Sequence, residues 1–407
     1  MAPLKRPYEP ADRLNALPDE ILLQILHRLA STPAAVRTGV LSRRWGRLWS
    51  ELTELRLDSV LAPVPGAHTV DGALAACSVG AVTCLRVSLN HLPLRDGDAI
   101  SAARVAAWLQ FASERVAGDL CILLPQATYS IEGGLHLPAE CDKITEITLW
   151  LGDRFRLCLP ASGTFATLMY LEIHDALMDC RELEEFVSCH CRRLEGLALR
   201  LPRLLGGSDI CIRSESLTQL DFHIEGTSRL EVAAPRLERL SVCSTEEAFI
   251  TAPELGEIVW EGNNFVAHRH GYAEAGRHLR RLVVTLSSWT ATLMRRFDTV
   301  DELIIDISIP HGENGYSSFI KDVDMLPSCK ALVVQSTSTS HGSIPIVLHL
   351  LRISSQIKKL VIYLEFMVNG LCKLLKCPCG SPKCHITDDI NLDLLEEVEI
   401  NLVTEEA

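Results

Sequence analysis

The densest group of potential metal ligands lies in the stretch LCKLLKCPCGSPKCH, which contains Cys372, Cys377, Cys379, Cys384 and His385. Thiolates and imidazoles are zinc ligands, and structural zinc sites favour pairs of ligands about two to four residues apart on two separate arms. Here a single proline separates Cys377 from Cys379, and all five side chains share one short stretch. This spacing argues against zinc, and we expect no metal site, although whether the stretch binds metal stays open.

Two further groups of possible ligands have structural alternatives. Cys189, His190 and Cys191 lie in CRELEEFVSCHCRRLEGLAL, which also fits a helix that leads into a strand at Leu197. His268 and His270 have no acidic or thiol-bearing residue at a matching spacing. We expect the first group to serve the core and a turn, and we do not expect the histidine pair to bind metal.

Motifs of catalysis are absent from the sequence. The pairs Gly133-Gly134 and Gly206-Gly207 are not followed by phosphate-loop residues, and turns explain them. There is no GxSxG turn and no arrangement that resembles a catalytic cysteine motif. The sequence therefore predicts a non-catalytic protein without a cofactor.

Composition limits the classes of partner. Acidic residues outnumber basic ones, 52 to 39, for a net charge of −13, which argues against nucleic acid. The most apolar run, IPIVLHLL, is too short to span a bilayer. The start, MAPLKRPYEPADR, does not resemble a secretory signal, so we expect the 15 cysteines to be reduced and residues 1–11 to form a disordered leader. Protein partners are the remaining class.

Residues 12–52 predict three short helices. Pro18 suits a first helical turn, and apolar residues follow it at helical spacing. Thr32-Pro33 predicts the start of a second helix, with Thr32 as its N-cap. Leu41, Trp45, Leu48, Trp49 and Leu52 would form one stripe of a third helix. A unit this small leaves apolar surface exposed, which favours a docking face, although a plain helical cap on the rest of the chain is the alternative.

The runs LPDEILLQIL and VRTGVLSRRWGRLW closely resemble the F-box of plant F-box proteins. That resemblance implies binding to a Skp-type adaptor and, through it, to a cullin-RING ligase. Carried over position by position, the adaptor-facing or core positions are Leu17, Pro18, Ile21, Leu22, Ile25, Val40, Leu41 and Trp45, and the sequence does not separate the two roles. Gly46 departs from the pattern and should weaken the third helix by about 1 kcal/mol relative to alanine.

The rest of the chain, residues 53–407, repeats one apolar pattern: an apolar residue, two variable ones, an apolar, a variable and an apolar. About fourteen copies occur, for example Leu194/Leu197/Leu199 and Leu237/Leu240/Val242, at irregular steps typical of leucine-rich repeats. Each copy predicts one strand, and stacked copies predict an α/β solenoid with a parallel sheet on its inner face. A generic α/β domain is the alternative.

Together these features resemble the plant F-box/leucine-rich-repeat proteins, and the stretch CPCGSPKCHITDDINLDLLEEVEI is similar to the grass type. The resemblance implies a substrate-recognition subunit of a Skp-cullin-F-box E3 ubiquitin ligase in the nucleus and/or cytoplasm. Two alternatives stay open: an adaptor-binding scaffold or sequestering protein with no role in degradation, and a receptor that needs a small-molecule ligand.

The outward-facing strand positions predict a substrate face. In the earlier repeats they hold a mixed polar set that includes Trp150 and His174, whereas the later repeats place Val283, Ile304, Val333, Val361 and Tyr363 there, edged by Thr285, Asp306 and Gln335. An aligned apolar stripe favours an interaction site. The alternative is that the stripe is covered or that its strands are buried on both faces. Because terminal repeats have one neighbour, we also expect the segment from about Cys377 onward to be the least stable.

Overall fold

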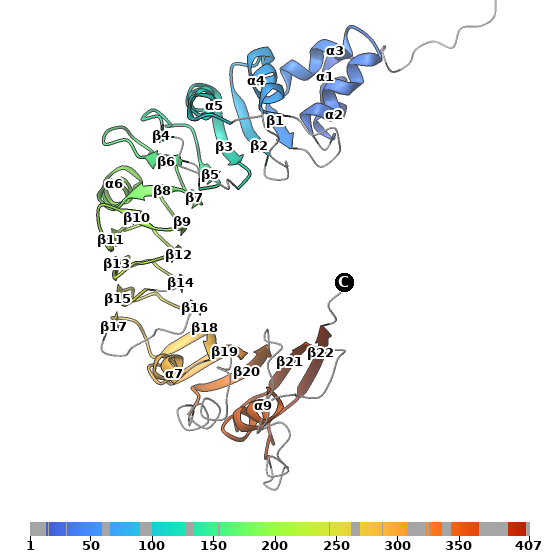
Figure 1. The fold of residues 1–407 in the computed structure, drawn as a ribbon. Helices are drawn as coiled ribbons and strands as arrows, with labels where there is room; N and C mark the ends of the chain where they lie inside the picture. The colour runs from blue at the N-terminus through green and yellow to red at the C-terminus, as the bar shows by residue number, and fades with distance from the viewer. Residues whose placement is uncertain are drawn as a thin grey trace, which may run out of the picture. The chain divides into compact units, whose positions relative to one another are not determined.

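The computed structural model describes residues 14, 16–29, 31–58, 66–89, 100–126, 133–153, 155–243, 245–261, 269–286, 288–307, 323, 325–335, 343–365 and 390–403. The chain divides into two compact units, Met1–Ala176 and Leu177–Ala407. Each unit combines parallel strands with a few helices (Figure 1).

The first unit begins with short helices. They are α1 (Asp19–His27), α2 (Thr32–Arg37), η1 (Thr38–Val40), α3 (Trp45–Leu48) and η2 (Trp49–Glu51). Pro18 is the N-cap of α1 and fixes the backbone where the helix starts. The N-cap of α2 is Ser31 and not Thr32 as predicted, because the Thr32 hydroxyl instead accepts a hydrogen bond of 2.9 Å from the Arg56 backbone N–H.

Parallel strands follow in the first unit. The main sheet holds β1 (Glu54–Asp58), β2 (Val82–Ser88), β3 (Val116–Leu123), β5 (Glu146–Trp150) and β7 (Tyr170–His174), and β4 (Gly133–His136) pairs with β6 (Phe155–Cys158). Helices α4 (Ala67–Ala76) and α5 (Ala102–Arg115) lie along one face of β1 to β3 (Figure 1).

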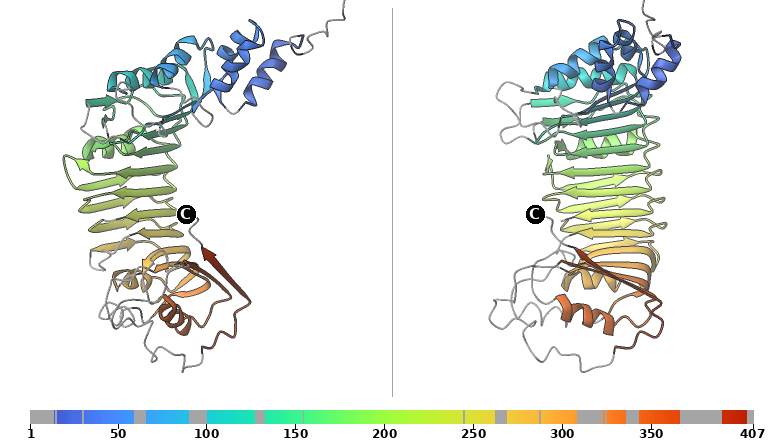
Figure 2. Two further views of the ribbon diagram at one scale, coloured as in Figure 1. Left: turned by 45° about the vertical axis from the view of Figure 1, so that its right-hand side comes forward. Right: turned by 90° about the vertical axis from the view of Figure 1, so that its right-hand side faces the viewer.

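The second unit stacks further parallel strands (Figure 2). In order they are β9 (Gly196–Leu201), β12 (Gln219–Ile224), β14 (Arg239–Cys243), β16 (Glu257–Glu261), β18 (His278–Leu286), β19 (Thr299–Ile307), β20 (Ser328–Gln335), β21 (Lys359–Glu365) and β22 (Glu397–Val403). The predicted solenoid-type α/β fold is confirmed, because each copy of the apolar pattern ends in one strand of the main parallel sheet.

Register aligns the pattern residues from strand to strand. Leu197 pairs with Leu220, Leu220 with Leu240 and Leu240 with Ile258, and each of these side chains is buried. Because alternate side chains of a strand point to opposite faces, this alignment builds one apolar ladder through the interior.

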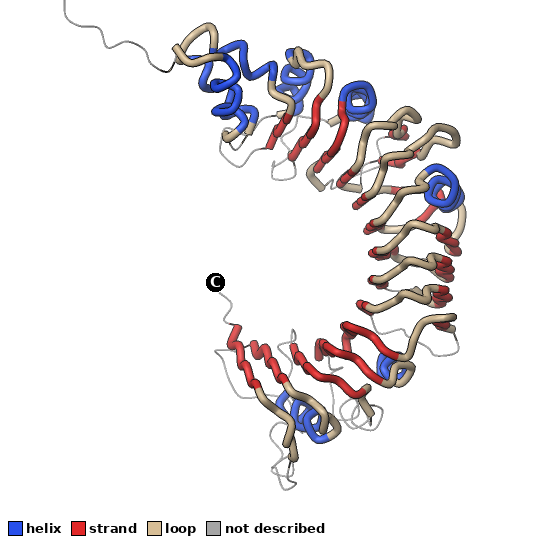
Figure 3. Tube along the Cα trace, turned by 180° about the vertical axis from the view of Figure 1, so that it is seen from behind, coloured by secondary structure: helices blue, strands red, loops and turns tan. Residues whose placement is uncertain are grey.

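The segments that connect one strand of the main sheet to the next differ with the length of the repeat. In the shorter repeats of the second unit they form a side sheet of β11 (Asp209–Arg213), β13 (Arg229–Ala233), β15 (Glu247–Thr251) and β17 (His270–Ala273), while β8 (Leu177–Asp179) pairs with β10 (Leu204–Leu205). Longer repeats hold helices α7 (Ser288–Met294) and α9 (Ser343–Arg352) (Figure 3). The predicted helix before Leu197 is present as α6 (Cys180–Glu185), which continues into η3 (Phe186–His190).

Strand β22 departs from the predicted burial. Val398 and Ile400 were expected in the core, but they are 54% and 60% exposed. Most of the segment from Cys377 onward, and the whole leader 1–11, lie outside the described residues. The domain boundary after Leu52 stays a prediction, and the bond from Arg56 to Thr32 joins the two sides of it.

Candidate functional site

The N-terminal helices form a core of their own. Its buried members are Leu22, Leu26, Ala35, Trp45, Leu48 and Leu52, and Leu17, Leu23, Ile25, Leu29 and Trp49 pack against them partly buried. Of the predicted adaptor-binding residues, Leu22 and Trp45 therefore have core positions, while Leu17 and Ile25 lie at the margin of the core. Leu41, predicted on the core stripe of the third helix, is instead 58% exposed, because that helix begins only at Trp45.

The other predicted adaptor-binding residues are exposed. Pro18 and Ile21 lie at the start of α1, Val40 is the last residue of η1, and Leu41 follows it in a turn. Val40 is 90% exposed, an extreme value for a β-branched apolar side chain. The structure thus separates the docking candidates from the core, which the sequence did not.

An ion pair links the start of α1, with Pro18 and Ile21, to the segment just after Val40 and Leu41. Asp19, which follows Pro18, accepts a hydrogen bond from Arg44, three residues after Leu41. The start of α1 is thereby tied to the segment that leads into α3. Pro18, Ile21, Val40 and Leu41 are called the apolar docking residues below.

The predicted substrate stripe is a continuous row in the second unit. Val283 pairs with Ile304, Ile304 with Val333 and Val333 with Val361, and Gln335 pairs with Tyr363. These side chains project from the face of the sheet opposite to the pattern residues Leu303 and Leu332.

The side chains at the centre of the stripe are buried. Ile304, Val333 and Val361 are only 6%, 7% and 6% exposed and pack as one cluster, against which Val283 and Tyr363 lie partly buried. Of the two alternatives that the sequence left open, burial on both faces holds for these central residues. Among the predicted residues, Val283, Tyr363 and the polar edge of Thr285, Asp306 and Gln335 keep some accessible surface.

Sequence reasoning missed one member of the row. Val259 on β16 pairs with Val283 and is half-buried, so the apolar row begins one strand earlier than predicted. Its position in the repeat, directly after Ile258, is the signal that could have identified it.

The chain resembles several curated proteins of Arabidopsis thaliana. It is 30% identical to F-box/FBD/LRR-repeat protein At2g04230 over 249 residues, which are 57% of this chain and 53% of the relative. It is 26% identical to F-box/LRR-repeat protein At3g03360 (48% and 42% covered) and 25% identical to F-box protein At3g60790 (56% and 48% covered). No protein-family model matches the chain.

These likenesses agree with the N-terminal helices and the parallel repeats. The chain is similar to plant F-box/leucine-rich-repeat proteins. It spans about half the length of the curated relatives it matches. These relatives come from Arabidopsis thaliana, so the grass type stays a prediction.

The outward positions of the earlier repeats carry polar side chains. In the first unit, Trp150 stacks on His174 with ring centroids 4.7 Å apart, and both reach the Glu172 carboxylate. In the second unit, Asp221 lies 3.2 Å from Arg200 and 2.7 Å from Nε2 of His223. Burial raises the pKa of Asp221, but the contacts with His223 and Arg200 outweigh it and hold that pKa at about 2.

Some of the ligand residues considered in the sequence lie in the described part of the chain. Cys191 is buried, and burial raises its thiol pKa to about 12, whereas Cys189 is exposed. His270 is buried edge-on against Trp260. Cys372 to His385 and His268 lie outside the described residues.

No helix in the described part of the chain combines the length and the apolarity that a bilayer crossing requires.

Proposed function

We propose that this chain is the substrate-recognition subunit of a Skp-cullin-F-box E3 ubiquitin ligase. Residues 12–52 would bind a Skp-type adaptor, and the repeats would bind a protein substrate. The observation that supports this most is the apolar docking residues, which stay exposed on a helical unit whose core is already complete without them. The names of the Arabidopsis relatives, which contain the terms F-box and LRR-repeat, agree with this proposal.

The adaptor would contact Pro18, Ile21, Val40 and Leu41 directly. Leu22 and Trp45 would support that surface from within the core, and Leu17 and Ile25 would do so from its margin. Interfaces concentrate their energy in a few apolar anchors, and a group of exposed apolar side chains fits that requirement.

The substrate would bind at the accessible edge of the stripe, at Val283 and Tyr363, with Thr285, Asp306 and Gln335 as polar neighbours. Ile304, Val333 and Val361 would pack together and so hold their strands, β19, β20 and β21, in place beside that edge. Stacked repeats provide extended surfaces of this kind.

The chain would act by positioning and would not carry ubiquitin itself. A substrate held close to the ubiquitin-charged enzyme of a cullin-RING ligase reacts at a raised effective concentration. This role needs no cofactor, nucleic acid or membrane, and it places the protein in the nucleus and/or cytoplasm.

Adaptor binding is tested with Val40→Asp/Leu41→Asp. Both side chains are exposed, so the helical core should stay folded while a purified Skp-type adaptor is no longer retained in a pull-down. Val36→Asp is the matched control, since Val36 is 42% exposed on α2 but is not a docking residue, and it should bind like the wild type. Equal retention of the adaptor by all three proteins would refute the assignment.

The second candidate function is an adaptor-binding scaffold that sequesters a protein without degrading it. The two candidates differ in the half-life of the bound protein. Proteins captured by the Val40→Asp/Leu41→Asp variant should live longer in cells that express this variant than in cells that express the wild type. An unchanged half-life would favour the scaffold.

A further inference from the structure

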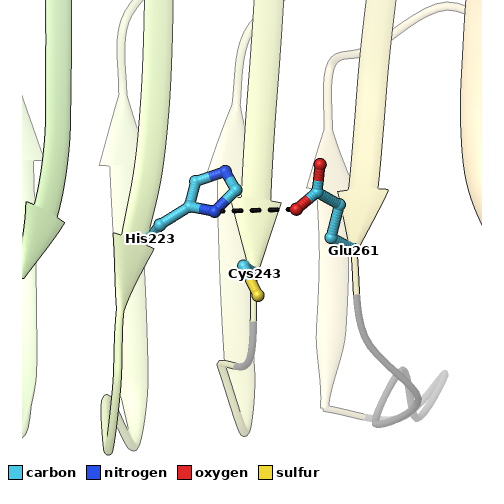
Figure 4. Close-up of side chains that lie close together, drawn as sticks. All are labelled: His223, Cys243 and Glu261. Atoms are coloured by element: carbon cyan, nitrogen blue, oxygen red, sulfur yellow. Dashed lines mark ion pairs between the residues drawn. The ribbon is translucent and has the colours of Figure 1, made fainter. Parts of the chain in front are cut away.

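Three side chains with metal-binding chemistry meet on the sheet of the second unit, outside the stripe. His223, Cys243 and Glu261 are the last residues or nearly the last residues of β12, β14 and β16, and register places them side by side: His223 pairs with Cys243, and Cys243 with Glu261 (Figure 4). One donor atom from each lies within 4.8 Å of the other two.

The surroundings of His223 orient its ring. Nε2 lies 2.7 Å from Asp221 Oδ1 and 3.1 Å from Ser241 Oγ, whereas Nδ1 faces Glu261 at 3.7 Å. The Asp221 carboxylate beside Nε2 can only accept, which favours the tautomer with the proton on Nε2. The lone pair of Nδ1 is then available on the side of Glu261.

This is the usual arrangement of a metal-binding histidine, whose second ring nitrogen faces a carboxylate that fixes the tautomer. Asp221 suits that supporting role because its carboxylate lies 2.7 Å from Nε2 of His223. Arg200 contacts Asp221 from the far side, 3.2 Å away, and so holds the carboxylate in place.

Distances also fit a metal ion. Zinc bonds of about 2.0–2.3 Å at tetrahedral angles put neighbouring ligand atoms roughly 3.3–3.8 Å apart. The 3.7 Å between His223 Nδ1 and Glu261 already lies in this range, and the 4.8 Å limit for the whole group requires side-chain shifts of about 1 Å.

We propose that His223, Cys243 and Glu261 bind a divalent zinc ion. Imidazole with a thiolate selects a borderline-soft metal over magnesium or calcium, and a thiolate with a carboxylate balances its two charges. Three protein ligands leave one position for water or for a donor from a bound partner. The ion would join three consecutive repeats.

The alternative is a plain ion pair between His223 and Glu261 with Cys243 beside it by chance. Glu261 is 55% exposed, so water screens such a pair and it contributes little to stability. The two explanations differ in the role of the thiol, which matters to a metal site and not to the ion pair.

Cobalt(II) is the probe, because a cobalt–thiolate bond gives a charge-transfer absorption in the near ultraviolet. The full chain, purified with a chelator and then dialysed, is titrated with cobalt(II) and afterwards with zinc(II). We expect one equivalent of cobalt to produce the band and zinc to abolish it. Cys243→Ser should lose the band, and His223→Gln and Glu261→Gln should each weaken zinc binding at least about tenfold.

Two control variants isolate the site. Cys211→Ser removes another half-buried thiol of the same unit, on β11, and should keep the band. Cys377→Ser/Cys379→Ser removes thiols of the C-terminal cluster and should also keep it. A band that survives Cys243→Ser, or no band in the wild type, would overturn the proposal. Adaptor binding, which uses other residues, is measured in parallel and should be unchanged in every variant.

Discussion

Gly39 and Gly46 lie directly against each other in the N-terminal helices: a Cβ added to Gly39 would lie 3.0 Å from the Gly46 Cα atom. A Cβ on Gly46 would lie 3.7 Å from the nearest Gly39 atoms, which is ordinary contact. The close approach therefore restricts Gly39 and leaves room at Gly46.

We expect opposite effects from alanine at these two positions. Gly46→Ala should stabilise the protein by about 0.5–1 kcal/mol, because alanine suits α3 better than glycine does. Gly39→Ala should destabilise it, since η1 and α3 must move apart. Urea unfolding of the helical region measures both, and a loss of stability in Gly46→Ala would contradict this packing.

Core and docking residues of the helical unit should respond differently to alanine. Leu22→Ala removes a fully buried side chain and should cost about 2–5 kcal/mol, whereas Val40→Ala should change stability by less than about 0.5 kcal/mol. Adaptor affinity should fall in Val40→Ala without any change in unfolding. Equal stability losses in the two variants would contradict the assignment of Leu22 to the core and of Val40 to the exposed surface.

Leu17→Ala/Pro18→Ala should abolish adaptor binding while the repeats stay folded, because Pro18 is exposed at the start of α1. Leu17 packs against the helical core, so some local destabilisation accompanies the loss. The pull-down is paired with circular dichroism of the repeats, and adaptor retention at wild-type strength would argue against this part of the docking surface.

Glutamate in the stripe should unfold the later repeats. Ile304→Glu/Val333→Glu buries two carboxylates at positions that are 6% and 7% exposed, and the stability loss should reach several kcal/mol. Val283→Asp/Tyr363→Ala changes the accessible edge instead and should keep the fold while substrate capture is lost. If the edge variant captures substrate normally, the site must lie elsewhere, first around Trp150 and His174.

Asp221 should make stability depend on pH in acid. Its folded pKa of about 2 lies below the ordinary 3.8, so the stabilisation is present above about pH 4 and is lost as pH falls through 2. The full shift corresponds to roughly 2 kcal/mol, but because the side chain is 33% exposed we expect about 1–2 kcal/mol. Unfolding of wild type and Asp221→Asn, with chelator present, should differ at pH 6 and converge near pH 2. A difference in the free energy of unfolding that is the same at both pH values would contradict this prediction.

The repeating apolar pattern was sufficient to predict the strands and the solenoid-type fold. One copy such as Leu237/Leu240/Val242 specifies both the strand and its buried face, because side chains alternate along an extended chain. Stacking then follows, since a single repeat cannot bury that face alone. Helix α1 was predictable for a similar reason, from Pro18 and the apolar spacing after it.

Tertiary structure alone decided which residues are accessible and which meet. The F-box pattern contains Leu22 and Val40 alike, and only packing makes the first a core residue and the second an exposed one. The stripe at Ile304 is apolar in sequence whether it is open or covered, since periodicity gives the direction of a side chain and not what lies above it. His223, Cys243 and Glu261 are separated by twenty and eighteen residues, and they share one place because parallel register brings equivalent positions of successive repeats together.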